Sequence, residues 1–268
     1  MINPSISEPS GYCTALASAW ETQCSELPVE NSPTPEHIRS TYVRSGHPVK
    51  IKGWMDEWEY MDGCTIDDIA RTHGHLLASV YSCSNRTHRW NEPLLQYIGR
   101  LRRAERGLLC SIHLIGEAAS LACDYARLEA FRDWFDVIDE PGVPVLRWLI
   151  LGPALAVNPL HCDIWKTSAW SALVLGCKSW LLLPPAPLSS TVPSASKAFI
   201  CSQEVGDIIF VPGGWSHEVL YHEESIAITG NFVDETNIHD VLPGLIADGL
   251  EDWAAVLSKV RDLLRGLP

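Results

Sequence analysis

The sequence predicts a mainly β fold with helical additions, on three observations. Glycine and proline signals recur in the second half of the chain at the spacing found in β-sandwiches and barrels. Outside this region, apolar residues recur at steps of three and four, which is the period of an amphipathic helix. Between the glycine and proline signals lie apolar runs of strand length, at 145–151, 171–183, 208–212 and 225–233.

Composition indicates a globular protein of one large domain or two modest ones, with 268 residues of which 46% are hydrophobic. No apolar stretch approaches the ~20 residues that cross a bilayer. The N-terminus lacks the order of a secretory signal, basic and then apolar. The nine cysteines are an odd number without a Cys-x-x-Cys motif, which disfavours a disulfide framework or a zinc ribbon. We therefore expect reduced thiols and a cytoplasmic or nuclear location.

The formal net charge of −13 constrains the partners. Proteins that bind a phosphate backbone carry a basic surface, so we expect no direct binding to nucleic acid. We expect no membrane partner either. A basic protein or peptide is compatible with this charge, although acidity can equally serve solubility alone.

Residues 1–40 are predicted to form an N-terminal helical or irregular segment. Short helical patches are expected at 12–22 and at 35–43. Thr34 can cap the second patch, and Pro35 suits the first turn of a helix.

The main domain is predicted to span 41–234. An alternating stretch at 48–53 indicates a short strand that ends at a glycine. Thr65 is followed by two acidic residues, as at a capped helix start. The apolar spacing predicts an amphipathic helix within 91–106, and 118–135 is predicted to be helical or mixed.

The C-terminal segment, 235–268, is predicted to form one or two helices packed on the barrel, with an interruption near Pro243. Packing against the barrel is one use for the apolar stripe of these helices, and a homodimer interface is the alternative. We favour packing. The stripe consists of Ile238, Leu242, Leu245, Ile246, Trp253, Leu257, Val260 and Leu264.

The candidate site residues begin with His161 and Asp163, which lie two positions apart. Side chains at i and i+2 of a β-strand project to the same face, so both can contact one metal ion. His217 follows a Pro-Gly-Gly turn and supplies a second imidazole. Two histidines and one carboxylate form the facial triad of non-haem Fe(II) oxygenases, which leaves open positions for co-substrate and dioxygen. His222 and Glu224 have the same spacing but lack this context, and we regard them as a decoy.

Three further residues suit an anionic co-substrate. Lys178 lies among apolar residues, where an unpaired ammonium is unfavourable, although an exposed lysine at a hairpin turn is the alternative. Thr229 and Asn231 lie two apart and share one face of a strand, with apolar Ile228 on the other face. Polar side chains on the inner wall of a barrel need a ligand or a partner.

The stretches 158–163, 167–185, 206–217 and 226–233 together resemble the Jumonji-C (JmjC) oxygenases, and 48–53 resembles the opening strand of that family. The resemblance implies a double-stranded β-helix, which is a cupin-like jelly roll, flanked by N- and C-terminal helices. It implies Fe(II), 2-oxoglutarate as co-substrate, and O2. It implies that His161, Asp163 and His217 hold the iron, and that Lys178 pairs with the far carboxylate of 2-oxoglutarate. The remaining pocket residues that it implies are Thr229, Asn231, Ser171 and Asn158.

Within that family, the Thr-Ser-Ala-Trp run and the Pro-Gly-Gly-Trp turn are most similar to the small protein hydroxylases of the lysyl-hydroxylase branches. The resemblance therefore implies hydroxylation of a residue, lysine in the first place, in a basic or translation-linked protein or peptide. Demethylation of N-methyl-lysine or N-methyl-arginine is one alternative, and a cupin-like binding module without catalysis is another. The tyrosine that often helps to bind the far carboxylate has no clear counterpart, and His113 and Tyr125 are the nearest candidates.

Overall fold

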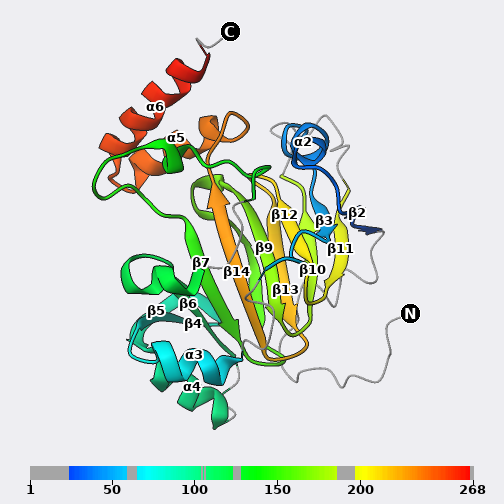
Figure 1. Ribbon diagram of the computed structural model, residues 1–268, viewed down its shortest axis with the longest axis vertical. Coiled ribbons are helices and arrows are strands. Elements are labelled where there is room, and N and C mark those ends of the chain that lie inside the picture. The colour runs from blue at the N-terminus through cyan, green and yellow to red at the C-terminus, as the bar shows by residue number, and fades with distance from the viewer. Residues whose placement is uncertain are drawn as a thin grey trace.

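The computed structural model describes residues 24–58, 65–103, 105, 107–122, 128–185 and 197–265. In this part of the chain, two β-sheets pack face to face as a jelly roll, with helices around them (Figure 1). The mainly β fold that the sequence predicts is thereby confirmed. The helix expected at 12–22 and the candidate Tyr125 both lie outside the described residues.

The larger sheet has nine strands. They are β2 (Val29–Asn31), β3 (Val49–Lys52), β4 (Leu77–Ser82), β5 (Asn85–Pro93), β6 (Leu108–His113), β7 (Arg147–Gly152), β9 (Ser168–Leu175), β12 (Ile208–Val211) and β14 (Ser225–Phe232). Their spatial order is β2-β3-β12-β9-β14-β7-β6-β4-β5. Strands β2 and β3 pair in parallel, and the other neighbours pair antiparallel.

The smaller sheet has five strands in the order β1-β11-β10-β13-β8. They are β1 (Ser25–Glu26), β8 (Val157–Cys162), β10 (Lys178–Leu183), β11 (Phe199–Gln203) and β13 (Ser216–Tyr221). The apolar run predicted at 171–183 is divided between the two sheets at Gly176, whose φ is 93°. A Cβ at Gly176 would lie 2.3 Å from Ser225 Oγ, so this close turn requires glycine.

Alternate residues of β12 show that both faces of the larger sheet are buried at this strand. Ile208 and Phe210 belong to the large core cluster that also includes buried residues of helices α3 (Ile66–His73) and α4 (Leu94–Arg102). The residues between and after them, Ile209 and Val211, belong to the core between the two sheets. Because both faces are covered, the strand is a continuous apolar run and does not alternate with polar residues.

The N-terminal helices begin where the capping residues predict. Helix α2 (Pro35–Ile38) continues into the π-helical turn η1 (Arg39–Val43), and the Thr34 hydroxyl accepts a hydrogen bond from His37 N at 3.2 Å. Thr65 and Asp68 form a capping box at the start of α3. Helix α2 and η1 are continuous past residue 40, and β2 pairs with β3.

The C-terminal residues form helices α5 (Ile238–Ala247) and α6 (Glu251–Arg265), which lie at the end of the molecule opposite α3 and α4 (Figure 1). Buried side chains of α5 and α6 pack with residues of the short helix η4 (Trp134–Val137) and with Leu146 and Val233. The interruption predicted near Pro243 is wrong, because α5 runs through this proline. The helix ends instead at Ala247, and Gly249 just beyond the cap residue has a φ of 74°, the left-handed conformation that follows many helices.

Membrane-spanning helices and disulfides are both disfavoured by the sequence. No helix in the described ranges has both the length and the apolar character that crossing a membrane requires. Within the same ranges, all six cysteines are free thiols: Cys24, Cys83, Cys110, Cys162, Cys177 and Cys201.

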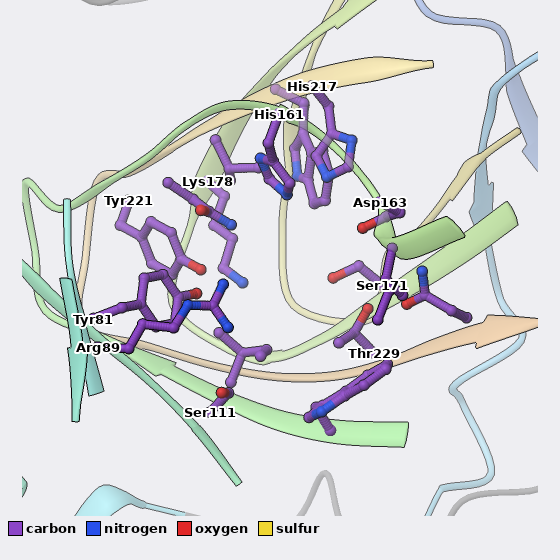
Figure 2. Close-up of a pocket in the computed structure, with 17 residues that line it drawn as sticks. Tyr81, Arg89, Ser111, His161, Asp163, Ser171, Lys178, His217, Tyr221 and Thr229 are labelled. Atoms are coloured by element: carbon purple, nitrogen blue, oxygen red, sulfur yellow. The ribbon is translucent and has the colours of Figure 1, made fainter. Parts of the chain in front are cut away.

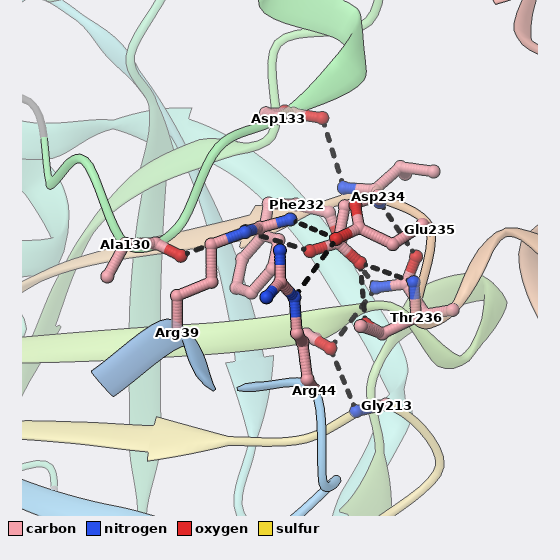
Figure 3. Close-up of polar contacts among 12 residues, drawn as sticks. Arg39, Arg44, Ala130, Asp133, Gly213, Phe232, Asp234, Glu235 and Thr236 are labelled. Atoms are coloured by element: carbon pink, nitrogen blue, oxygen red, sulfur yellow. Dashed lines mark hydrogen bonds and ion pairs between the residues drawn. The ribbon is translucent and has the colours of Figure 1, made fainter. Parts of the chain in front are cut away.

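Arg39 connects the N-terminal helix to the chain that follows β14 (Figure 3). Its guanidinium lies 3.3 Å from Asp234 Oδ2 and 2.6 Å from Glu235 Oε1. The Asp234 side chain is buried, and that burial raises the pKa of its carboxyl. On the other side, Asp133 Oδ1 accepts a hydrogen bond from Val233 N at 3.0 Å. The segment after β14 is therefore held from both sides.

Replacing Arg39 with alanine is expected to lower the free energy of unfolding by about 3–5 kcal/mol, because it leaves a buried carboxylate without its cation. Urea denaturation measures this loss. Arg44→Ala is the matched control, since the Arg44 side chain is 56% exposed and lies 3.9 Å from Glu235. It should change the free energy of unfolding by less than about 0.5 kcal/mol. Equal losses in the two variants would contradict the assignment of Arg39 to a buried ion pair.

Candidate functional site

Two histidines and one aspartate meet where β8 and β13 pair. His161 and His217 are direct cross-strand partners, and their ring centroids lie 4.2 Å apart. One ligand atom from each of His161, Asp163 and His217 lies within 4.8 Å of the others. Figure 2 shows the three side chains at one side of a pocket between the sheets.

Asp163 reaches this group from outside the strand, which differs from the expectation. Strand β8 ends at Cys162, and Asp163 precedes the short 3-10 helix η5 (Ile164–Lys166). Its backbone is still extended, with φ −66° and ψ 159°. The carboxylate therefore projects to the side of the His161 ring, although no ladder bond continues to this position.

The orientation of the His161 ring is fixed by the backbone. Nδ1 donates a hydrogen bond to Pro159 O at 2.8 Å. The other ring nitrogen, Nε2, then carries the lone pair that can bind a metal ion. Metal-binding histidines in proteins are usually oriented by such a bond. The centroid of the Trp180 ring lies 5.6 Å from the centroid of the His217 ring.

The pocket has a volume of about 230 Å³. It lies between the sheets, with walls from both. Every site residue that the sequence predicts lines it: Asn158, His161, Asp163, Ser171, Lys178, His217, Thr229 and Asn231. Residues from five separate strands and one loop thus converge on one cavity.

Lys178 is a buried cation that lines this pocket. It is the first residue of β10 and is only 2% exposed. Its Nζ lies 4.5 Å from the centre of the Tyr221 ring, in cation–π geometry. Burial lowers the pKa of Lys178 to about 7. No anion among the described residues counters this desolvation, so the ammonium is suited to receive an anionic ligand.

The polar side chains of the opposite wall are partly committed to the protein. The Thr229 hydroxyl donates to Trp170 O at 2.7 Å, and Asn231 Nδ2 donates to Thr167 Oγ1 at 2.8 Å. Both residues line the pocket. Buried Asn158 Oδ1 has no hydrogen-bond partner within the described residues, as expected for an atom that a bound ligand satisfies.

Four lining residues with a hydroxyl or a charged group were not predicted from the sequence: Tyr81, Arg89, Ser111 and Tyr221. The two tyrosines are nearer candidates for the co-substrate tyrosine than His113, whereas Tyr125 lies outside the described residues. His113 does not line the pocket; its ring stacks on Trp148 and hydrogen-bonds Val145 O. Arg89 brings a second cation, with its guanidinium over the Tyr81 ring at 5.2 Å.

His222 and Glu224 lie outside the pocket. His222 Nε2 is hydrogen-bonded to Ser179 Oγ at 2.7 Å, and Glu224 forms an ion pair with Arg102 at 2.8 Å. Neither residue lines the pocket. The sequence spacing of a histidine and an acid two positions later therefore has no metal-binding consequence here.

The arrangement suits a metal ion with an anionic ligand beside it. Two imidazole nitrogens and one carboxylate oxygen, all on one side, would occupy one face of an iron ion and leave the other face toward the pocket. Lys178 stands in the same cavity to pair with a carboxylate. The donor set therefore fits Fe(II), and the pocket fits a small dicarboxylate.

No protein-family model matches the chain. It is 31% identical over 233 residues to lysine-specific demethylase JMJ21 of Arabidopsis thaliana, covering 74% of this chain and 25% of that protein. It is 27% identical over 259 residues to the bifunctional arginine demethylase and lysyl-hydroxylase psr-1 of Caenorhabditis elegans, covering 80% and 62%. It is 26% identical over 215 residues to the 2-oxoglutarate and iron-dependent oxygenase JMJD4 of Homo sapiens, covering 65% and 51%. The chain thus spans between 25% and 62% of the length of these relatives.

Proposed function

Since this chain belongs to the Jumonji-C (JmjC) family, we propose that it is an Fe(II)- and 2-oxoglutarate-dependent oxygenase that hydroxylates a residue of a protein substrate. One observation carries the proposal. The ligand atoms of His161, Asp163 and His217 converge within 4.8 Å in the pocket that also holds the buried cation Lys178. A facial triad with a carboxylate-binding cation in the same pocket suits this chemistry.

In the proposed site, His161, Asp163 and His217 hold the iron, and Lys178 holds the far carboxylate of 2-oxoglutarate. When bound, iron and 2-oxoglutarate supply the oxidation, in which O2 delivers one oxygen atom to the substrate and the other to succinate. The protein orients these groups and excludes water. Trp180 and Val219 give the pocket apolar walls, and such walls strengthen the contact of Lys178 with a carboxylate.

Tyr221 and Arg89 support the assignment of this end of the pocket to a carboxylate. Tyr221 packs its ring against Lys178 Nζ and lines the cavity. Arg89 adds positive charge to the same wall. Asn158, Ser171, Thr229 and Asn231 are proposed to contact the co-substrate through their pocket-facing polar atoms.

The proposed substrate is a protein or peptide, with lysine as the first residue to examine. The relatives include a lysyl-hydroxylase and demethylases. The acidic net charge of −13 suits a basic partner. We therefore propose a basic or translation-linked protein as the substrate class.

Mass spectrometry of reacted peptides tests this proposal. The Fe(II)-loaded protein is incubated with 2-oxoglutarate and a library of lysine-containing and N-methylated peptides. We expect succinate release coupled to a product that gains one oxygen atom. A product that loses a methylene group would assign demethylation instead. Absence of both iron binding and 2-oxoglutarate turnover would identify a non-catalytic binding module.

Self-association and a cytoplasmic or nuclear location stay predictions. Self-association through the C-terminal helices would use the exposed apolar residues Leu263 and Leu264 of α6. The molar mass in solution by light scattering tests it. A cytoplasmic or nuclear location agrees with the free thiols of the described residues, and imaging of the tagged protein in cells tests it.

A further inference from the structure

The loop after Asp163 has a backbone conformation that only its surroundings can hold. Trp165 has φ 50° and ψ 19°, and Lys166 has φ 56°. Non-glycine residues in the left-handed region are uncommon, and two in succession persist only where packing fixes them. Asp163 lies at the N-terminal end of this loop. Contacts that fix the loop therefore also set the position of the Asp163 carboxylate.

Helix α5 fixes one side of the loop. Trp165 Nε1 donates a hydrogen bond to Asp248 Oδ2 at 2.8 Å. The tryptophan also lies against Gly244, where an added Cβ would come within 2.9 Å of Trp165 Cα, Cβ and Cδ1. Such an approach requires a residue without a side chain. The ion pair of Lys166 with Asp240 is 3.2 Å long, but both side chains are more than half exposed, so it adds little.

The turn before His217 fixes the other side. An added Cβ at Gly213 would lie 2.6 Å from Lys166 O. Gly213 N and Asn237 Nδ2 both donate to Ser168 Oγ, at 3.0 and 3.1 Å. The loop that carries Asp163, the turn that leads to His217 and the residue that precedes α5 thus meet at one point.

We propose that Trp165 is a positioning residue, which transmits the position of α5 to the Asp163 carboxylate and thereby sets the affinity for the metal. Trp165 does not line the pocket, so it acts through Asp163 and not by touching metal or co-substrate. Helices α5 and α6 contribute no lining residue either. Helix α5 would therefore influence the metal site only through its contacts with Trp165. The inference rests on the metal site of the proposed function.

Titration of the full chain with Co(II) tests the inference, because the visible absorption bands of Co(II) report its coordination geometry. Gly244→Ala is expected to raise the Co(II) Kd at least tenfold and to change the bands, since the new methyl group displaces Trp165. Gly99→Ala is the matched control in helix α4. Its Cβ would meet only Arg103 Nη1, at 3.5 Å, which is an ordinary contact. This control is expected to keep the Co(II) Kd and the bands.

Two substitutions at Asp248 separate positioning from general stability. Asp248→Asn keeps an oxygen that accepts from Trp165 Nε1, and it is expected to bind Co(II) as the wild type does. Asp248→Ala removes the acceptor and is expected to raise the Co(II) Kd several-fold. Trp165→Phe keeps an aromatic ring and loses only the donor, so it reports on the hydrogen bond if Gly244→Ala does not fold. The 2-oxoglutarate affinity of the folded variants should fall less than their metal affinity.

The outcomes distinguish this inference from the proposed function. A wild-type chain that binds neither Co(II) nor Fe(II) would overturn the proposed function, and this inference with it. A wild type that binds Co(II), beside folded Trp165→Phe and Asp248→Ala variants with wild-type Kd and bands, would overturn the positioning role alone. Weakened binding in these variants, with recovery in Asp248→Asn, would establish it.

Discussion

Replacing His217 with alanine is expected to abolish measurable metal binding and all turnover of 2-oxoglutarate. His217 is buried, faces the His161 ring across paired strands, and supplies one of three ligand atoms that lie within 4.8 Å of one another. Changes beyond the ligands themselves already weaken metal sites by about 10–100-fold, so loss of a ligand should exceed about 100-fold. Calorimetric titration with Fe(II) or Mn(II) under anaerobic conditions measures the affinity.

His222→Ala is the control for this experiment. His222 lies five positions along the chain from His217 but is hydrogen-bonded to Ser179 and does not line the pocket. Its loss should leave metal affinity and succinate release unchanged. Retention of wild-type metal binding by folded His217→Ala would remove the proposed metal site, whereas loss in both variants would point to unfolding, which circular dichroism detects.

Raising the pH above 7 is expected to weaken 2-oxoglutarate binding about tenfold per pH unit. Burial lowers the pKa of Lys178 to about 7, so the ammonium form that a carboxylate requires becomes the minor form above this pH. A bound carboxylate favours the charged form and raises the pKa again. At pH 8 the binding of 2-oxoglutarate should therefore take up about one proton. Calorimetry in buffers of different ionisation enthalpy measures this uptake.

Without ligand, the lowered pKa of Lys178 makes the folded protein more stable as the pH rises above 7. Between pH 7 and the ordinary range of a lysine, the unfolded chain holds more protons at residue 178 than the folded protein does. The destabilisation caused by burying Lys178 therefore diminishes as the pH rises through this window.

Lys178→Arg is the control for the pH prediction. Arginine stays protonated in this range, so its binding curve should lose the pH dependence whether its affinity is high or low. Lys178→Met should bind 2-oxoglutarate weakly at every pH. A wild-type affinity that stays constant from pH 6 to 9 would contradict the role of Lys178 as the titrating cation.

The sequence predicts most of the site because its residues lie in strands with a clear period. Thr229 and Asn231 face the pocket while Ile228 and Phe232 enter the outer core, as alternation requires. The same rule could have found Tyr221. His217, Val219 and Tyr221 lie at i, i+2 and i+4 of one strand, and all three line the pocket. The spacing along β13, and no family motif, brings this tyrosine into the pocket.

Other parts of the site could not be predicted from local pattern. Tyr81 and Arg89 reach the pocket because β4 and β5 join the larger sheet through β6 and β7. That pairing is between distant segments, and no motif in the sequence marks it. Strand β8 is not among the apolar runs that predict strands, since most of its side chains face a polar pocket or solvent and it contains Pro159. Hydrophobic periodicity does not detect a strand whose inner face binds a ligand.

The conformation of the loop after Asp163 is also outside the reach of local reasoning. Tryptophan and lysine both disfavour a left-handed backbone, so their intrinsic preferences predict the opposite of what Trp165 and Lys166 adopt. Contacts with Gly213 and Gly244, remote in sequence, decide the outcome. The helix break expected near Pro243 fails for the same reason. Tertiary packing carries α5 through this proline against its local preference.

The direct pairing of His161 with His217 makes the site depend on strand register. Side chains along a strand alternate between faces, so a slip of one residue between β8 and β13 would turn one imidazole to the far side of the sheet. The site therefore depends on the number of residues in the turn before β13 as much as on their identity. Insertions or deletions at this turn should be far more damaging than substitutions of its neighbours, and variation in chain length among relatives should be found elsewhere.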